Sequence, residues 1–171
     1  MGNMLLDIST LVLATATVVL ALATILLVWE SRHASKRQNG LKTWMYFREW
    51  FDTREMIEAR RELAKLMRAY TQEKHPFVPE TVMNFFEDLG TVYSQGYIDK
   101  KLADATFSYY AVRWWEVVKP YVDHERKRHN EDNTLFEDFE KLAKLMRQPE
   151  DVLDADQMKI FLSDENNIAA K

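Results

Sequence analysis

The chain of 171 residues contains no cysteine and only four glycines and four prolines. Without cysteine it can form no disulfide, no thiolate nucleophile and no sulfur-ligated metal site. So few glycines and prolines favour long helices over many short strands joined by tight turns. The sequence also lacks a glycine-rich phosphate loop, a GxSxG elbow and a kinase signature. We therefore expect an all-α protein that is not an enzyme and holds no cofactor and no metal.

One long stretch also lacks charge. Residues 8–29, ISTLVLATATVVLALATILLVW, are 22 uncharged residues between Asp7 and Glu30. At about 1.5 Å per residue they make roughly 33 Å of helix, enough to cross a hydrocarbon core of about 30 Å. The alternative is a signal peptide cleaved after the ALA at residues 21–23. However, no Lys or Arg precedes the stretch, and it exceeds the roughly 7 to 15 apolar residues of a signal peptide, so we expect a retained transmembrane helix.

Charged residues are distributed unevenly after this helix. Residues 30–74 carry 11 Lys/Arg and 7 Asp/Glu, whereas residues 75–171 carry 12 and 19. Because Asp7 is the only charged side chain before the span, the positive-inside rule puts the N-terminus outside and residues 30–171 in the cytoplasm. The lack of a concentrated basic face argues against a nucleic-acid partner. The basic residues expected to face anionic lipid are Arg32, Lys36, Arg37 and Lys42.

Small side chains recur along one side of the predicted span, at spacings of 4, 3, 4 and 3 residues. Such a stripe lets two membrane helices approach closely, and threonine hydroxyls can bond across the contact. The stripe therefore predicts a homo-oligomer. Ordinary span composition is the alternative, because Ala16 and Ala23 lie off the stripe. The predicted seam consists of Thr10, Ala14, Thr17, Ala21 and Thr24.

The rest of the chain has helical apolar spacing. We expect a basic juxtamembrane segment at 30–43, a compact bundle of about four helices at 44–147, and an acidic, loosely ordered tail at 148–171. The aromatic stretch 44–51 fits either a core helix or a helix lying on lipid, and core packing is the expected arrangement.

Local signals predict where the bundle helices begin and end. Asp52 with Glu55, and the TLFE run from Thr134, both have the form of a capping box. Asp99 is expected to cap a third helix, and a fourth is expected between Pro79 and Gly96. The loop QEKHPFVPE precedes that fourth helix.

The stretch YAVRWWEVVKPY at 110–121 is predicted to be mainly the interior of the bundle. Trp114 and Trp115 are about 100° apart around a helix, so both are buried only if packing covers a wide arc. Pro120 is expected to bend or break the helix, and Glu116 to pair with a basic residue three positions away. The alternative is a candidate interaction patch made of Arg113, Trp114 and Glu116.

Three stretches carry a family resemblance: MNFFEDLGTVYSQGYIDKKLA, WEVVKP and FEDFEKLA. In combination, over roughly residues 44–147, they resemble the bacterial family catalogued as domain of unknown function 4760. The resemblance implies an all-helical architecture anchored by one N-terminal span, and hence a location in the bacterial inner membrane. It supplies no activity and no catalytic residues.

The stretch DHERKRHNED at 123–132 superficially resembles a zinc protease helix. His124 and His129 are five residues apart, about 140° around a helix, so they do not form the two-histidine face of such enzymes. A solvated segment of mixed charge is the expected structure.

Three functions are compatible with these patterns. The first is a membrane-anchored interaction or scaffolding module that binds a protein partner. The second is a small effector or pore-forming protein regulated by its bundle, and the third is an enzyme whose site is assembled from distant residues. The strong span and the absence of catalytic motifs favour the first.

Overall fold

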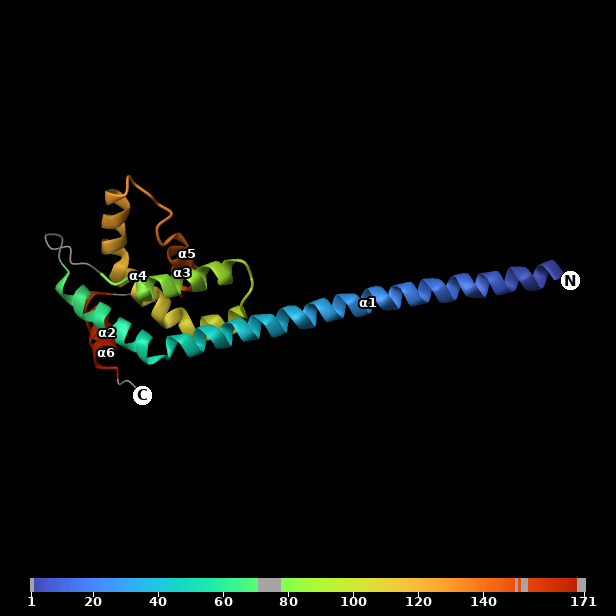
Figure 1. The fold of residues 1–171 in the computed structure, drawn as a ribbon, viewed down its shortest axis with the longest axis horizontal. Helices are drawn as coiled ribbons and strands as arrows, with labels where there is room; N and C mark the ends of the chain where they lie inside the picture. The colour runs from blue at the N-terminus through green and yellow to red at the C-terminus, as the bar shows by residue number, and fades with distance from the viewer. Residues whose placement is uncertain (1, 71–77, 150, 152–153, 169–171) are drawn as a thin grey trace. The chain divides into compact units, whose positions relative to one another are not determined.

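The fold is described from a computed structural model, whose described residues are 2–70, 78–149, 151 and 154–168. Side chains are described from residue 15 onward, except those of residues 33 and 36. The chain divides into two units, residues 1–39 and 40–171. Every regular element in the described residues is a helix, which confirms the all-α prediction (Figure 1).

The first unit contains the apolar segment of α1 (Gly2–Phe51) and the start of the basic stretch that follows it. Among the described residues, α1 is the one helix long and apolar enough to cross a membrane. Its large apolar side chains from Val18 to Trp29 lie open: Val18, Leu22 and Trp29 are 59%, 57% and 62% exposed. So much contiguous apolar surface is rare on a soluble protein, because water is a poor solvent for it. The helix continues without interruption through the predicted juxtamembrane segment at 30–43.

The second unit begins with the aromatic end of α1. Phe47 and Phe51 are buried, and their ring centroids lie 5.6 and 5.2 Å from that of Phe85. The indole nitrogen of Trp44 donates to the hydroxyl of Thr106 at 3.1 Å. The inward side of the stretch 44–51 therefore packs in the core, as expected. Tyr46, on the other side, is 62% exposed.

Helices α2 (Arg54–Ala69) and α3 (Thr81–Ser94) follow. The N-cap of α2 is Thr53, whose hydroxyl accepts from the backbone N–H of Met56, so the prediction that Asp52 caps this helix is wrong. Asp52 instead pairs with Arg48 one turn earlier. Gly96, at φ +72°, allows the chain to leave α3, as the sequence indicates. The predicted loop QEKHPFVPE, which precedes α3, lies largely outside the described residues.

Helix α4 (Lys100–Arg128) is the longest helix within the second unit. Asp99 caps it by accepting from the backbone N–H of Leu102 at 3.1 Å, as predicted. The helix continues through Pro120 for another two turns, so the predicted break does not occur. Trp114 and Trp115 are both buried, because different helices cover the two sides of α4. Phe161 lies against Trp114 and Phe139 lies against Trp115, each with ring centroids 5.2 Å apart.

Helix α5 (Glu137–Met146) begins later than predicted. Thr134 forms no capping box, because its N–H and hydroxyl both bond to the carboxylate of Asp132. The residue before the helix is Phe136, which adopts a left-handed conformation at φ 55° and is buried. A buried ring in a strained backbone is compatible with folding only when surrounding contacts hold it there.

Helix α6 (Ala155–Asn167) corrects the prediction of a loosely ordered tail. Asp154 caps it, and Phe161 and Leu162 are 1% and 8% exposed. The helix packs mainly on α2 (Figure 1). Within residues 44–147 the end of α1 is followed by four helices, α2 to α5, as predicted, and α6 follows them in the described part of the second unit.

Gly90 shows how closely α3 and α5 approach each other. A Cβ atom on Gly90 would lie 2.3 Å from the carbonyl oxygen of Asp138 and 2.7 Å from its carbonyl carbon. Both are backbone atoms, so they cannot rotate away as a flexible side chain can. The contact therefore requires glycine for its lack of a side chain.

We predict that Gly90→Ala lowers the free energy of unfolding by about 2 kcal/mol, because overpacking costs more than the helix gains from alanine. Chemical denaturation of the full chain in detergent measures this. Asn84→Ala, at an exposed position of the same helix, is the matched control and should be close to neutral. Equal stability of the two variants would show that α3 and α5 do not approach this closely.

Candidate interaction site

The candidate interaction patch predicted from the sequence, Arg113, Trp114 and Glu116, consists of one core residue and two residues at the surface. Trp114 is fully buried, so it belongs to the core and is removed from the patch. Arg113 is partly exposed, and its guanidinium lies 3.8 Å from the ring centroid of Tyr109 and 4.0 Å from the Asp151 carboxylate. Glu116 is also partly exposed and pairs with Arg147 of the segment after α5. The predicted pairing of Glu116 three residues away along α4 is therefore wrong.

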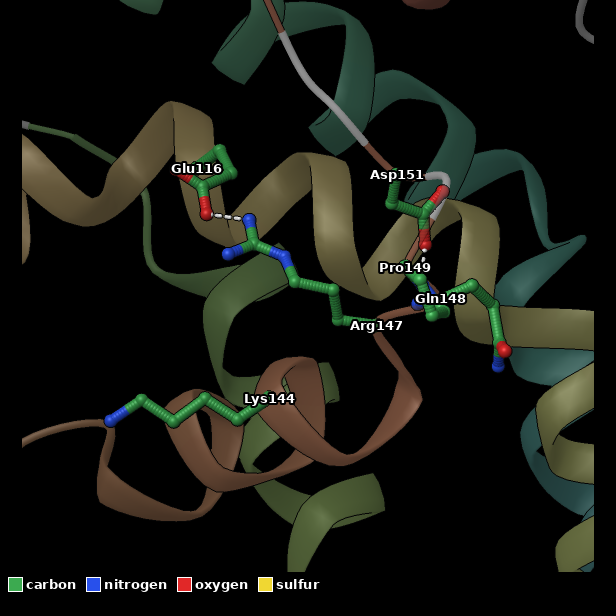
Figure 2. Close-up of a pocket in the computed structure, with 6 residues that line it drawn as sticks. All are labelled: Glu116, Lys144, Arg147, Gln148, Pro149 and Asp151. Carbon is green, nitrogen blue, oxygen red and sulfur yellow. Dashed lines mark hydrogen bonds and ion pairs between the residues drawn. The ribbon is translucent and has the colours of Figure 1, made fainter.

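Arg147 and Glu116 lie at a cleft of about 580 Å³ between α4 and the end of α5 (Figure 2). Figure 2 shows Arg147 reaching across to the Glu116 carboxylate, while the Lys144 side chain extends away from it. The far wall is a turn in which the Gln148 N–H donates to the Asp151 carboxylate at 2.9 Å. The cleft is lined by Glu116, Lys144, Arg147, Gln148, Pro149 and Asp151.

Glu116 lines two further clefts. One, of about 150 Å³, lies between α4 and α5 and reaches Trp115 and Lys119. The other, of about 600 Å³, has Tyr70 and His124 in its lining, together with Pro120 of α4. These clefts combine carboxylates with ammonium and guanidinium groups in similar number, so no single sign of charge dominates. Such a surface suits a polar protein partner better than a phosphate-rich one.

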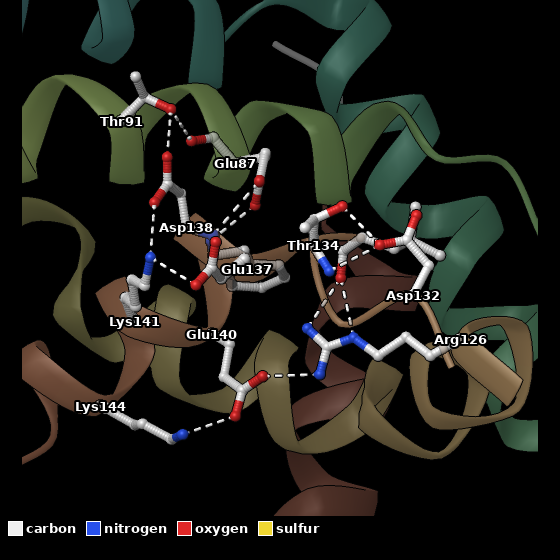
Figure 3. A network of polar contacts seen from close by, with 12 residues as sticks. Glu87, Thr91, Arg126, Asp132, Thr134, Glu137, Asp138, Glu140, Lys141 and Lys144 are labelled. Atoms are coloured by element: carbon white, nitrogen blue, oxygen red, sulfur yellow. Dashed lines mark hydrogen bonds and ion pairs between the residues drawn. The ribbon is translucent and has the colours of Figure 1, made fainter. Parts of the chain in front are cut away.

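The position of α5, and with it the cleft wall, depends on a carboxylate from α3. Glu87 accepts from the backbone N–H groups of Asp138 and Phe139 at 3.3 and 2.7 Å, and so caps α5 from another helix (Figure 3). Thr91 donates to the Asp138 carboxylate at 2.8 Å. Burial raises the pKa of Glu87, although the two N–H groups oppose this. The cap that the sequence placed at Thr134 is thus supplied by a residue 50 positions away from α5 in the sequence.

A second connection joins α4 to α5. Arg126, which is 9% exposed, donates from its Nε and Nη2 to the carbonyl of Leu135 and from its Nη1 to the Glu140 carboxylate at 2.7 Å (Figure 3). Lys144 also donates to Glu140, and this bond, aided by Arg126, lowers the pKa of the Glu140 carboxyl. The bidentate guanidinium fixes the chain just before the strained Phe136.

The predicted seam lies in the first unit, as do Arg32, Lys36 and Arg37 of the basic flank, whereas Lys42 belongs to the second unit. Within the seam, the side chains of Thr10 and Ala14 lie outside the described residues, while Thr17, Ala21 and Thr24 are exposed. The Thr24 hydroxyl donates to the Leu20 carbonyl of its own helix at 2.8 Å, so its proton is not available to a partner helix. Arg32, Arg37 and Lys42 are exposed, and the side chain of Lys36 is not described.

The histidines of the stretch 123–132 are separated in the structure. His124 lines a cleft on α4, whereas His129 is exposed at the end of that helix with Glu125 3.8 Å away. Within the described residues, no three or more His, Asp or Glu side chains are grouped so that they could hold a metal ion.

Arg60 is the functional candidate that sequence reasoning missed. Arginine is seldom fully buried, yet Arg60 is 2% exposed and pairs with Glu165 of α6, which is 4% exposed. Its position relative to Met56, Leu63 and Met67, which lie four residues before it and three and seven residues after it on the same side of the helix, is the signal that could have found it.

These features define a class: an all-α bundle that follows a long apolar helix, with mixed-charge clefts around its central helix. Within that class, the model of the family described as a domain of unknown function (DUF4760) matches residues 11–146, which is most of the chain, and the chain belongs to this family. The match begins inside the apolar segment and ends with the last residue of α5. No curated protein and no solved structure matches the chain.

Because Trp114 lies in the core and Glu116 at the surface, we predict that substitutions at these two positions change stability by different amounts. Trp114→Ala should lower the free energy of unfolding by about 3–5 kcal/mol, because it leaves a cavity in the core. Glu116→Ala should cost less than about 1 kcal/mol, because an exposed ion pair contributes little. Thermal and chemical unfolding of both variants measures this. Similar losses for the two would mean that Glu116 is part of the core framework.

Proposed function

We propose that this protein is a single-pass membrane protein of the bacterial inner membrane whose helical bundle binds a protein partner in the cytoplasm. The observation that carries the proposal is the first unit: an apolar helix whose large side chains from Val18 to Trp29 are all open. An uncharged segment of this length is stable when lipid covers it. The family match supports retention of the segment, since part of it lies within the shared domain.

The orientation rests on charge. Arg32, Lys36, Arg37 and Lys42 follow the apolar segment, while Asp7 precedes it. Such an asymmetry favours a cytoplasmic location of the basic end, where anionic lipid headgroups attract it. In this orientation the bundle is presented to cytoplasmic proteins. Self-association through the stripe from Thr10 to Thr24 would add copies of the bundle to one assembly.

Partner binding is assigned to the clefts that Glu116 lines. Their lining combines both signs of charge with polar groups, and Glu116 projects from α4 whereas Arg147 and Asp151 project from the segment between α5 and α6. A partner that bonds to such groups must match their positions, and this gives specificity more than raw affinity. The pore alternative has less support, because the Thr24 hydroxyl donates within its own helix.

The absence of cysteine makes the orientation testable with single introduced cysteines. In spheroplasts, an impermeant maleimide should label Asn3→Cys directly and Gln95→Cys only after the membrane is opened. Both variants should remain in the membrane after carbonate washing. The cysteine-free parent is the control for unspecific labelling. Labelling of Gln95→Cys in intact spheroplasts, or release of the chain by carbonate, would contradict the proposal.

The cleft is tested by reversing one charge. Glu116→Lys places two cations together at the Arg147 position, so partners that co-purify with the parent chain after cross-linking in membranes should be lost by at least about tenfold. Glu62→Lys makes the same charge change on the exposed side of α2 and should keep them. Both variants must unfold like the parent. Unchanged capture by Glu116→Lys, or no partner captured by any chain, would refute cleft binding while leaving membrane anchoring intact.

A further inference from the structure

Helix α6 packs on α2 and α4, and the surface that it covers, which includes Arg60 and Trp114, is called the groove. Its buried side consists of Phe161, Leu162 and Glu165, while Ile160 on the same short helix is 61% exposed. Phe161 packs edge-on against Trp114, with ring centroids 5.2 Å apart. The fully buried part of the contact thus consists of two apolar side chains and one carboxylate, with Met158 partly buried beside them.

The carboxylate meets a buried guanidinium. Glu165 Oε2 lies 3.5 Å from Arg60 Nε, and the guanidinium carbon lies 4.1 Å from the ring centroid of Phe51. Within the described residues, Arg60 Nε, Arg60 Nη1 and Glu165 Oε2 have no hydrogen-bond partner. The two charges therefore lose their water without gaining the full set of bonds that would compensate for it.

Because of this geometry, the Arg60–Glu165 ion pair contributes little to the binding of α6 but requires a carboxylate at the position of Glu165. Burial raises the pKa of the Glu165 carboxyl, opposed by Arg60 and assisted by Asp164. A group with a raised pKa in the folded state stabilises it below its unfolded pKa, and that contribution is lost as the pH rises through the folded value. Near neutral pH, docking of α6 therefore carries an electrostatic cost. Any occupant of the groove must still bring a carboxylate, because Arg60 alone would be a buried, unpaired charge.

The segment between α5 and α6 is long enough for α6 to reach a groove other than that of its own chain. Eight residues, 147–154, separate α5 from α6, and when extended they span about 27 Å. Helix α6 has 13 residues, a length at which an isolated helix is marginal in water, so it requires a groove in which to fold. It also lies outside the residues matched to the family, whereas Arg60 lies within them.

We propose that the groove is a helix-binding site that α6 of a second copy of this chain enters, so that neighbouring copies exchange their α6 helices. A second copy is the occupant because it carries the same Phe161, Leu162 and Glu165 at the spacing that the groove accepts. Attachment to one membrane raises the effective concentration of the second copy, and an identical element can be exchanged at little cost in contacts. The exchange uses α2, α4 and α6, while the connection at 147–154 also supplies Arg147 and Asp151 to a cleft that Glu116 lines.

Reversing the buried charges provides the test. Full-length Arg60→Glu places two carboxylates in the groove, and full-length Glu165→Arg places two cations there, so neither chain can dock α6 in itself or in its own kind. When the two variants share one lipid bilayer, each groove matches the other chain's helix. Hydrogen exchange of α6 should be at least about tenfold faster in each variant alone and should slow again in the mixture.

Matched controls make the same charge changes at exposed positions: Arg68→Glu on α2 and Asp164→Arg on α6. Each should keep α6 protected without a second variant. Protection that returns in the mixture of Arg60→Glu and Glu165→Arg supports exchange between copies. Protection that stays low in the mixture overturns it, provided that the cysteine experiment below agrees.

A second measurement keeps both charges native. Arg61 donates to the Ile168 carbonyl, so these two positions are close when α6 is docked. Copies with Arg61→Cys are mixed with copies with Ile168→Cys and treated with a short bis-maleimide. Dimers that depend on both cysteines are expected. If a chain carrying both cysteines forms only an internal cross-link, and the mixture forms no dimer, α6 stays in its own groove and the proposal is wrong.

Discussion

The burial of Trp114 and Trp115 on two sides of α4 is the constraint on which the arrangement of the bundle depends. Adjacent residues on a helix point about 100° apart, so a single neighbouring helix cannot cover both rings. Phe139 of α5 covers one and Phe161 of α6 covers the other. Helix α4 is therefore enclosed from two directions, and each enclosing helix is short and needs its own anchor.

The two anchors differ in quality. Helix α5 is held by Glu87 at its first turn and by Arg126 through the Leu135 carbonyl, with hydrogen bonds between 2.7 and 3.3 Å. Helix α6 is held by an ion pair at 3.5 Å, of which three polar atoms lack hydrogen bonds within the described residues. A buried charge pair with incomplete hydrogen bonding contributes little to stability but strongly disfavours a mismatched occupant. The contact between α4 and α5 is thus stabilised by complete hydrogen bonding, whereas the contact with α6 depends on an ion pair that disfavours a helix without a matching carboxylate.

Sequence patterns predicted the parts of this fold that depend on local chemistry. Helical spacing and the scarcity of glycine indicated an all-α chain, the Asp99 cap needs only the residue three positions later, and the apolar run is evident from composition. The patterns failed where the partner is distant in the sequence. The first turn of α5 is capped by Glu87 and not by Thr134, and Arg60 is buried because α6 brings Glu165 to it.

The candidate site shows the same division. The stretch around Glu116 was noticed for its aromatic and charged residues, but spacing along one helix could not tell that Trp114 faces the core. Nor could it indicate Arg147 as the partner of Glu116, because that contact depends on where α5 ends. Helical periodicity identifies the buried side of an amphipathic helix best when the other sides face solvent. Helix α4 is covered by other helices on more than one side, so its periodicity is a weaker guide.

Pro120 has one more consequence. It continues α4 without interruption, yet it has no N–H to give to the Glu116 carbonyl four residues earlier. Both residues line the same cleft of about 600 Å³. The wall of this cleft is therefore a stretch of α4 that lacks one of the main-chain hydrogen bonds that hold the rest of the helix.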